Sequence, residues 1–175
     1  MEMNEKDKRV FEVLVAVTAI PKNIIKMHGT ENITEFVLHN LCQKECFNLT
    51  KAAYFIDNPD FDHLKGVAGF SHLEAYKSQQ NHWSEVDLFT QHMKAIEFNN
   101  KVRDICLCSM KKNKDSEKDV IQNLSETLNL SNPRYFVWPT KYDNNGVFLF
   151  ESPEDSVAEE HLEETMHLFG FCSIF

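Results

Sequence analysis

The sequence lacks the short motifs that mark common catalytic and nucleotide-binding sites. Glycine is scarce, with five in 175 residues, and only Gly66 and Gly69 lie close together. They form neither a GxxxxGK[ST] nor a GxGxxG phosphate-binding loop. A GxSxG nucleophile elbow and an HExxH zinc motif are absent as well. These absences favour a non-enzymatic protein over an enzyme.

Clustered positive charge and long apolar runs are also missing. The formal net charge is −9, and the longest basic cluster, residues 111–114, is soon followed by acidic residues. Nucleic acids are bound through clustered Lys and Arg that release counterions, so we expect no nucleic-acid partner. The most apolar stretch, residues 10–20, contains Glu12 and is far shorter than the roughly 20 residues of a membrane span. We therefore expect neither a membrane anchor nor a secretory signal.

The cysteine count argues against a disulfide framework. Five cysteines are an odd number, and a chain of 175 residues is long enough to fold without cross-links. Free cysteines are typical of a reducing compartment, so we expect a cytoplasmic protein. The length fits one domain over residues 1–175, and 14 phenylalanines supply the bulk for its core.

Apolar spacing predicts two helices at the start of the chain. Apolar residues recur at helical spacing through residues 10–20 and predict a helix that ends near Pro21, with another turn possible after it. Asn32, followed by Glu35 three residues later, resembles an N-terminal capping box. It predicts a second helix over residues 32–47.

Two hairpins and further helices are expected in the rest of the chain. Strand-forming residues flank turn residues in two places, which predicts hairpins over 52–57 with 64–70 and over 134–140 with 147–151. Helical spacing returns in 72–101, in 120–128 and after Ser152-Pro153, whereas 102–110 fits a helix end or a short strand. This order favours an α+β fold, a central antiparallel sheet with flanking helices, over a parallel doubly wound sheet.

The element order and two segments resemble a GAF domain, a small-molecule sensory fold related to PAS. The first segment is residues 35–70, which ends in LKGVAGF, and the second is YFVWPTKYDNNGVFLFESPEDSVAEEHLEETM. Pro139 and Gly146-Val147 match the family's strand that ends in proline and the residues that follow it. The resemblance implies a non-enzymatic sensory or regulatory module that binds a small molecule or a partner protein. The Asn-Lys-Phe ligand set of cyclic-nucleotide-binding members is not recognisable, so ligand and cofactor stay open.

Two groups of residues are candidates for binding chemistry. Four aromatic residues are candidates for lining a small apolar ligand pocket, although aromatic residues at such spacings are more often part of a core: Tyr54, Phe70, Trp83 and Trp138. Four cysteines suggest an alternative function, a structural zinc site or a thiol-dependent redox enzyme: Cys42, Cys46, Cys106 and Cys108. Buried packing is the simpler interpretation of these cysteines, because neither pair has the usual C-x₂-C spacing.

The N-terminal helix, within residues 1–28, is apolar around much of its circumference. Seven residues carry this character: Val10, Phe11, Val13, Leu14, Val15, Val17 and Ile20. One domain covers only one side of a helix, so we expect a homodimer that buries the other side. The alternative is a helix sandwiched within its own domain, between the sheet and the C-terminal helix around Leu162 and Met166.

Overall fold

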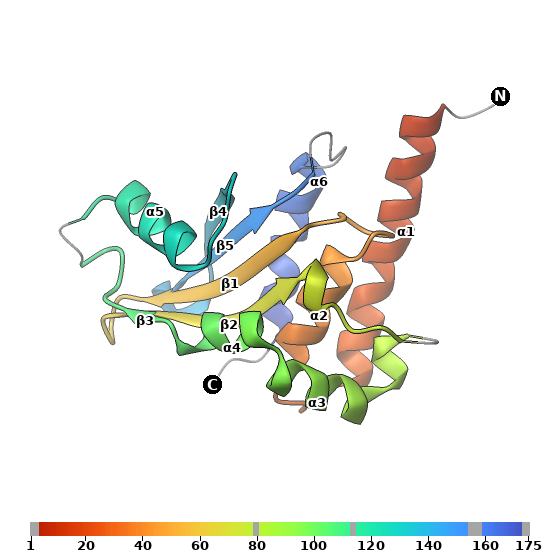
Figure 1. Ribbon diagram of the computed structural model, residues 1–175, viewed down its shortest axis with the longest axis horizontal. Coiled ribbons are helices and arrows are strands. Elements are labelled where there is room, and N and C mark those ends of the chain that lie inside the picture. The colour runs from red at the N-terminus through yellow and green to blue at the C-terminus, as the bar shows by residue number, and fades with distance from the viewer. Residues whose placement is uncertain (1–3, 79–80, 113–114, 154–158, 173–175) are drawn as a thin grey trace.

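The computed structural model describes residues 4–78, 81–112, 115–153 and 159–172, and within them a central sheet is flanked by helices (Figure 1). The helices are α1 (Glu5–Lys26), α2 (Ile33–Cys42), α3 (Val86–Ala95), α4 (Glu97–Asp104), α5 (Glu117–Thr127) and α6 (Glu159–Glu164), which η4 (Thr165–Phe171) continues as a 3₁₀ helix. The strands are β1 (Lys51–Asn58), β2 (His63–Ser71), β3 (Cys106–Leu107), β4 (Arg134–Pro139) and β5 (Asn145–Glu151). The predicted α+β class is confirmed.

The five strands form one antiparallel sheet in the order β3-β2-β1-β5-β4. Both predicted hairpins are confirmed as β1–β2 and β4–β5. The two hairpins join through β1 and β5, whose pairing runs from Lys51 opposite Glu151 to Asp57 opposite Asn145. All strand pairs are antiparallel, so the alternative of a parallel doubly wound sheet is wrong.

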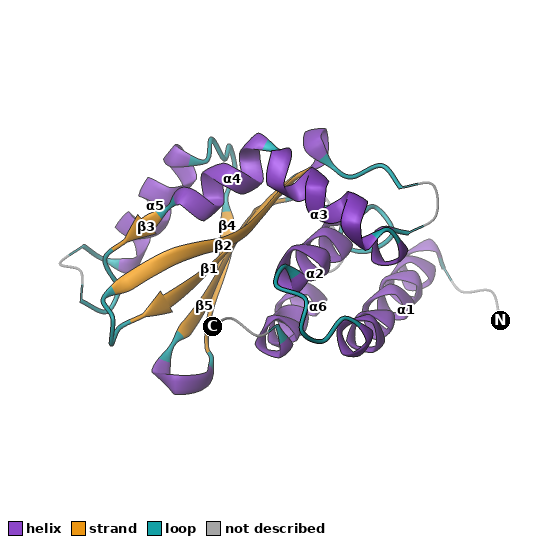
Figure 2. Cartoon of the chain, turned by 90° about the horizontal axis from the view of Figure 1, so that it is seen from below, coloured by secondary structure: helices purple, strands orange, loops and turns teal. Residues whose placement is uncertain are grey.

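Helices cover both faces of the sheet, so its central strands are buried on both sides (Figure 2). Successive side chains of a strand point to opposite faces, which divides neighbours in β1 between two cores. Tyr54 joins the core beneath α1, α2 and η4, whereas Phe55 joins the core beneath α4 and α5. In both views α1 lies outermost, on the far side of α2 from the sheet.

Helix α1 passes straight through the proline that was expected to end it. Proline lacks the N–H that continues the hydrogen-bond ladder, and its ring crowds the preceding turn. Ile20 and Ile24 are buried on either side of exposed Pro21, so their packing holds the helix together as far as Lys26. The predicted end near Pro21 is therefore wrong and the further turn considered after it is present, because tertiary burial outweighs one missing hydrogen bond.

Helix α2 is shorter than predicted and begins differently. It ends at Cys42, and residues 43–47 form a turn in which the N–H of Phe47 donates to the carbonyl of Leu41 at 3.0 Å. The Asn32 side chain makes no cap hydrogen bond, and its Nδ2 donates instead to Glu35 Oε2 at 3.1 Å. The predicted capping box is wrong because the Asn32 amide is turned so that its Nδ2 donates to Glu35 and to Thr90 Oγ1, and its oxygen caps no backbone N–H of α2.

The remaining expectations are met in part. Both alternatives for residues 102–110 hold, since α4 ends at Asp104 and β3 follows it. The two close glycines allow this arrangement: a Cβ at Gly66 would overlap the carbonyl of Val102, and one at Gly69 would overlap the Val102 side chain. The predicted helix start after Ser152-Pro153 falls on residues 154–158, outside the described residues. Within the described ranges, no helix is long and apolar enough to cross a membrane.

Candidate functional site

Helix α1 has two apolar sides, and only one of them is covered. Val13, Ile20 and Ile24 are buried and face α2 and η4. On the opposite side Phe11, Leu14, Val15 and Ile25 are 60, 45, 54 and 76% exposed. We call this side the outer stripe, and it comprises Phe11, Leu14, Val15, Thr18, Lys22 and Ile25, all exposed. The alternative of a helix sandwiched within its own domain is wrong, because nothing in the described residues covers the stripe.

The outer stripe is unusual for this molecule. Elsewhere in the described residues the large exposed apolar side chains lie one to an element, on separate turns and helices: Phe61, Leu73, Leu88, Tyr142 and Phe171. Single apolar residues on a surface are ordinary, whereas contiguous ones mark interaction surfaces. Helical periodicity gathers those of α1 on one line, so this helix is the strongest candidate for a binding surface.

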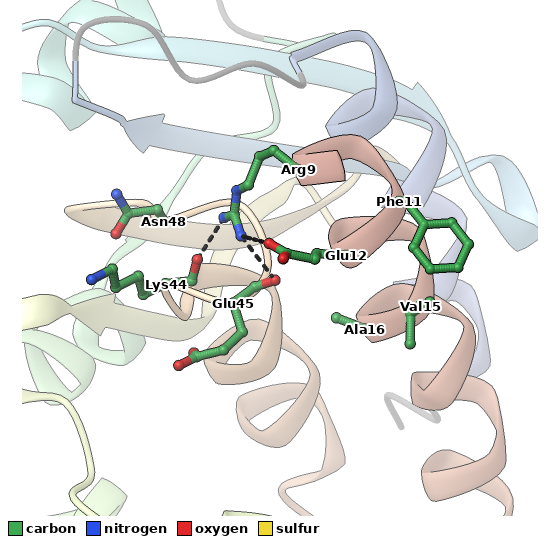
Figure 3. Close-up of a pocket in the computed structure, with 8 residues that line it drawn as sticks. All are labelled: Arg9, Phe11, Glu12, Val15, Ala16, Lys44, Glu45 and Asn48. Atoms are coloured by element: carbon green, nitrogen blue, oxygen red, sulfur yellow. Dashed lines mark hydrogen bonds and ion pairs between the residues drawn. The ribbon is translucent and has the colours of Figure 1, made fainter. Parts of the chain in front are cut away.

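A groove of about 850 Å³ adjoins the N-terminal half of the stripe (Figure 3). It lies between α1 and the turn that follows α2, and it is lined by Arg9, Phe11, Glu12, Val15, Ala16, Lys44, Glu45 and Asn48. Its α1 lining combines Phe11, Val15 and Ala16 with Arg9 and Glu12, and the turn adds Lys44 and Glu45, so two positive and two negative side chains are present. Apolar side chains beside a balanced set of charges resemble the composition of protein–protein interfaces more than that of an anion or cation site.

Arg9 fixes the geometry of this groove by bridging its two walls. Its Nη2 donates to the carbonyls of Lys44 at 2.5 Å and Cys46 at 2.6 Å, and its Nη1 donates to the carbonyl of Glu45 at 3.4 Å. Glu12 adds an ion pair at 3.8 Å. The guanidinium fork thus satisfies carbonyls just beyond the end of α2 and holds the turn against α1.

The four aromatic residues predicted to line a ligand pocket all pack in one core. Tyr54 is 1% exposed and stacks on Phe169 with ring centroids 4.3 Å apart, and the Trp138 ring lies 5.8 Å from Tyr54 and 6.4 Å from Phe169. Phe70 is buried against His39 at 5.3 Å. The ring centroids of Trp83 and Phe36 are 5.3 Å apart, and Trp83 Nε1 donates to Asn40 Oδ1 at 2.7 Å. A ligand among these rings would have to displace core side chains, so their role in ligand binding stays a prediction.

The four candidate cysteines do not converge on one site. Cys42 and Cys46 are buried at and after the end of α2, and Cys106 and Cys108 are exposed at the edge strand β3. Over the described ranges, no three His, Cys, Asp or Glu side chains are placed to hold a metal ion. Burial raises the pKa of Cys46 to about 12, against the opposing effect of Arg9, and also raises the pKa of Cys42. Neither buried thiol is therefore suited to act as a thiolate nucleophile.

Two buried histidines form a structural cluster that sequence reasoning missed. His39 Nε2 accepts from the backbone N–H of Tyr76 at 3.0 Å, and its ring lies 4.8 Å from that of His82. His82 Nε2 lies 3.2 Å from the carbonyl of Phe36. Burial lowers the pKa of His39 to about 3 and that of His82 to about 4. Both are neutral near pH 7 and tie the segment before α3 to α2.

A buried carboxylate on the same helix was also missed. Glu35 is 3% exposed, and its Oε1 accepts from Arg103 Nη1 at 2.8 Å and from Asn99 Nδ2 at 2.9 Å. Asn99 in turn accepts from the N–H of Gly69 at 2.9 Å. This network joins α2, α4 and β2. The structure buries α2 nearly all round, but four of its ten residues are polar, so the sequence carried no signal that Glu35 would be buried.

No protein-family model, curated protein or solved structure matches this chain. The inner polar residues are engaged in holding the fold together, as the hydrogen bonds of Glu35, His39 and Arg9 illustrate. In the described residues the outer stripe of α1 has no such structural use, and beside it lies the groove whose two walls Arg9 joins. They are the candidate functional site.

Proposed function

We propose that the protein is a non-enzymatic regulatory module of GAF-like fold that works as a homodimer assembled through the outer stripe of α1. The observation that carries the proposal is the exposure of Phe11, Leu14, Val15 and Ile25 along one side of a helix whose other side already belongs to the core. An apolar surface of this kind is stabilised when a second protein covers it.

The GAF-like part of the proposal is supported by the order of elements. Two helices, a hairpin, helices, a second hairpin and a final helix follow one another as they do in the resemblance drawn from the sequence. The hairpins lie side by side in one antiparallel sheet. Sensory domains of this fold often pair through their terminal helices, and α1 is such a helix.

A second copy of the chain is the partner that the surface favours. A twofold dimer presents the same patch from both sides, so an apolar stripe meets an apolar stripe. The groove rim adds Arg9 and Lys44 to Glu12 and Glu45, a balanced set that does not repel its own copy. Twofold dimers are also the commonest assembly of soluble chains.

Light scattering coupled to size-exclusion chromatography tests the proposal over a range of protein concentrations. The unmodified chain is expected to run as a dimer at micromolar concentration, and Val15→Glu as a monomer with an unchanged circular dichroism spectrum. Val15 is exposed in the single chain, so its charge disturbs only the interface.

Leu88→Glu is the matched control. Leu88 lies on α3 and is 58% exposed, close to the 54% of Val15, so it should leave the dimer intact. An unmodified chain that stays monomeric at high micromolar concentration would show that the homodimer proposal is wrong. A Leu88→Glu variant that dissociates as readily as Val15→Glu would place the interface elsewhere.

A further inference from the structure

We infer that the two α1 helices pack antiparallel across a twofold axis at Thr18, so that Phe11 of each copy lies against Ile25 of the partner subunit. This arrangement rests on the homodimer proposed above and specifies its interface. It concerns direction and register, which can be wrong even if the dimer is right.

Four of the other five residues of the outer stripe stand in pairs at equal distances from Thr18, and Val15 alone has no counterpart in the stripe. Phe11 lies seven residues before it and Ile25 seven residues after it, which is close to two helical turns in each direction. Leu14 and Lys22 stand four residues away on either side. In an antiparallel pair centred on Thr18, the large apolar ends of the stripe therefore meet twice, about 10.5 Å from the axis.

Thr18 suits the position where the helices approach most closely. Its side chain is small, and Oγ1 already donates to the carbonyl of Val15 at 2.9 Å. Contact with the partner would therefore bury a hydroxyl whose donor is satisfied within its own helix. Ala19, also exposed, keeps the neighbouring position small. Small residues at the crossing allow an interaxial distance near the short end of the usual range of about 8–10 Å.

Charge distribution favours the antiparallel direction over the parallel one. The first turn of α1 carries no net charge, because Glu5 and Asp7 alternate with Lys6 and Lys8, so it does not decide the direction. Antiparallel packing opposes the two helix dipoles favourably. Parallel packing would set Lys22, which lies within the stripe, beside Lys22 of the partner subunit.

The groove gives the partner's Ile25 a place to pack. Ile25 is the most exposed apolar side chain of α1, at 76%. Antiparallel register brings it to the groove mouth, next to Phe11 and Val15. The turn opposite is already held by Arg9, so little ordering is needed for this contact to form.

Disulfide cross-linking tests direction and register. The background is Cys106→Ser with Cys108→Ser, which removes the two exposed thiols and leaves the buried ones. In it, Thr18→Cys is expected to form a disulfide-linked dimer on mild oxidation, about tenfold more than either Phe11→Cys or Ile25→Cys alone, because a disulfide needs close Cα atoms. A variant with both Phe11→Cys and Ile25→Cys should cross-link as Thr18→Cys does.

Each outcome separates the arrangement from the dimer itself. Light scattering of the same variants under reducing conditions reports whether a dimer is present at all. If the dimer persists and all three single variants cross-link equally, the helices are parallel and the inference is wrong. If the dimer persists and Thr18→Cys does not cross-link, the register is wrong. If no dimer is seen, the proposed function fails first.

Discussion

Helices α1 and α5 both pack on the core by one side, but the sides that face away from the core differ in composition. Helix α5 buries Val120, Ile121 and Leu124 and exposes only polar and charged residues on its other side. Helix α1 buries Val13, Ile20 and Ile24, yet its outer side is also largely apolar. Packing against the core accounts for one apolar side of each helix. On α5 the opposite side, which faces water, is polar.

The difference therefore points to a second neighbour for α1. Both helices begin with a side-chain cap, so each is locally specified. They differ in the residues of the side that faces away from the core. Experiments that separate the inner side of α1 from its outer stripe will sharpen this comparison or break it.

The largest expected effect comes from a matched pair of isoleucines on α1. Ile20 is fully buried, and Ile20→Ala should lower the free energy of unfolding by about 2–5 kcal/mol, through lost burial and the cavity left behind. Ile25→Ala, at the exposed position, should change the stability of the monomer by less than about 0.5 kcal/mol. Urea unfolding at a concentration where the protein is monomeric measures both. Equal losses would mean that the outer stripe belongs to the core.

Acidic pH should lower the stability of the fold without dissociating the dimer. The pKa values of His39 and His82 are lowered in the folded protein, to about 3 and about 4 from 6.5, so the unfolded chain binds more protons between these values. Stability should fall as the pH drops from about 6.5 toward 4, by about 2 kcal/mol for each histidine at pH 5. The outer stripe contains no histidine, so molecules that remain folded should stay dimeric.

Urea unfolding at pH 7.5 and pH 5, with light scattering at both, checks this prediction. The pH dependence of the unmodified chain is the reference. His82→Asn should weaken that dependence. A dimer that dissociates at pH 5 while the fold is intact would contradict the apolar interface.

The smallest effects should come from the helix caps. Ser116 and Asp119 form a capping box at the start of α5, and Ser116→Ala should cost about 1 kcal/mol. The Asn4 side chain accepts from the N–H of Asp7 at 2.8 Å at the start of α1, where the next four residues are all exposed. Asn4→Ala should therefore cost only a few tenths of a kcal/mol, because that turn can fray alone. Equal costs in urea unfolding would show that the first turn of α1 is coupled to the core.

Local patterns were enough to predict the two hairpins. Each combines strand-forming residues with turn residues, Asn58-Pro59-Asp60 in the first and residues 141–144 in the second, so their signals lie within a few residues of one another. The structural settings of Pro21 and Glu35 depend on tertiary packing and could not be predicted from nearby residues. Burial of Ile20 and Ile24 carries the helix through the proline, and Glu35 is occupied by Arg103 and Asn99, more than 60 residues away. One sequence does not reveal such distant partners.

The candidate site was predictable only as an excess of apolar residues on the first helix. The seven residues named from the sequence mix the two sides, since Val13 and Ile20 are core and Phe11, Leu14 and Val15 are exposed. Ile25, the most exposed apolar residue of α1, is not among the seven. The groove was not predictable, because its second wall is the turn after α2, which Arg9 holds through backbone carbonyls.

The strand order also has a consequence for how the chain acquires its structure. The two hairpins are local, but the central pairing joins Lys51 to Glu151 and Ala52 to Phe150. Such high contact order slows folding, because a long loop must close, at an entropic cost, before the paired strands gain stability. During synthesis one edge of β1 stays unpaired until β5 leaves the ribosome. This unpaired edge exposes the first hairpin to aggregation. Chaperone dependence should therefore be greatest for nascent chains that end before residue 145.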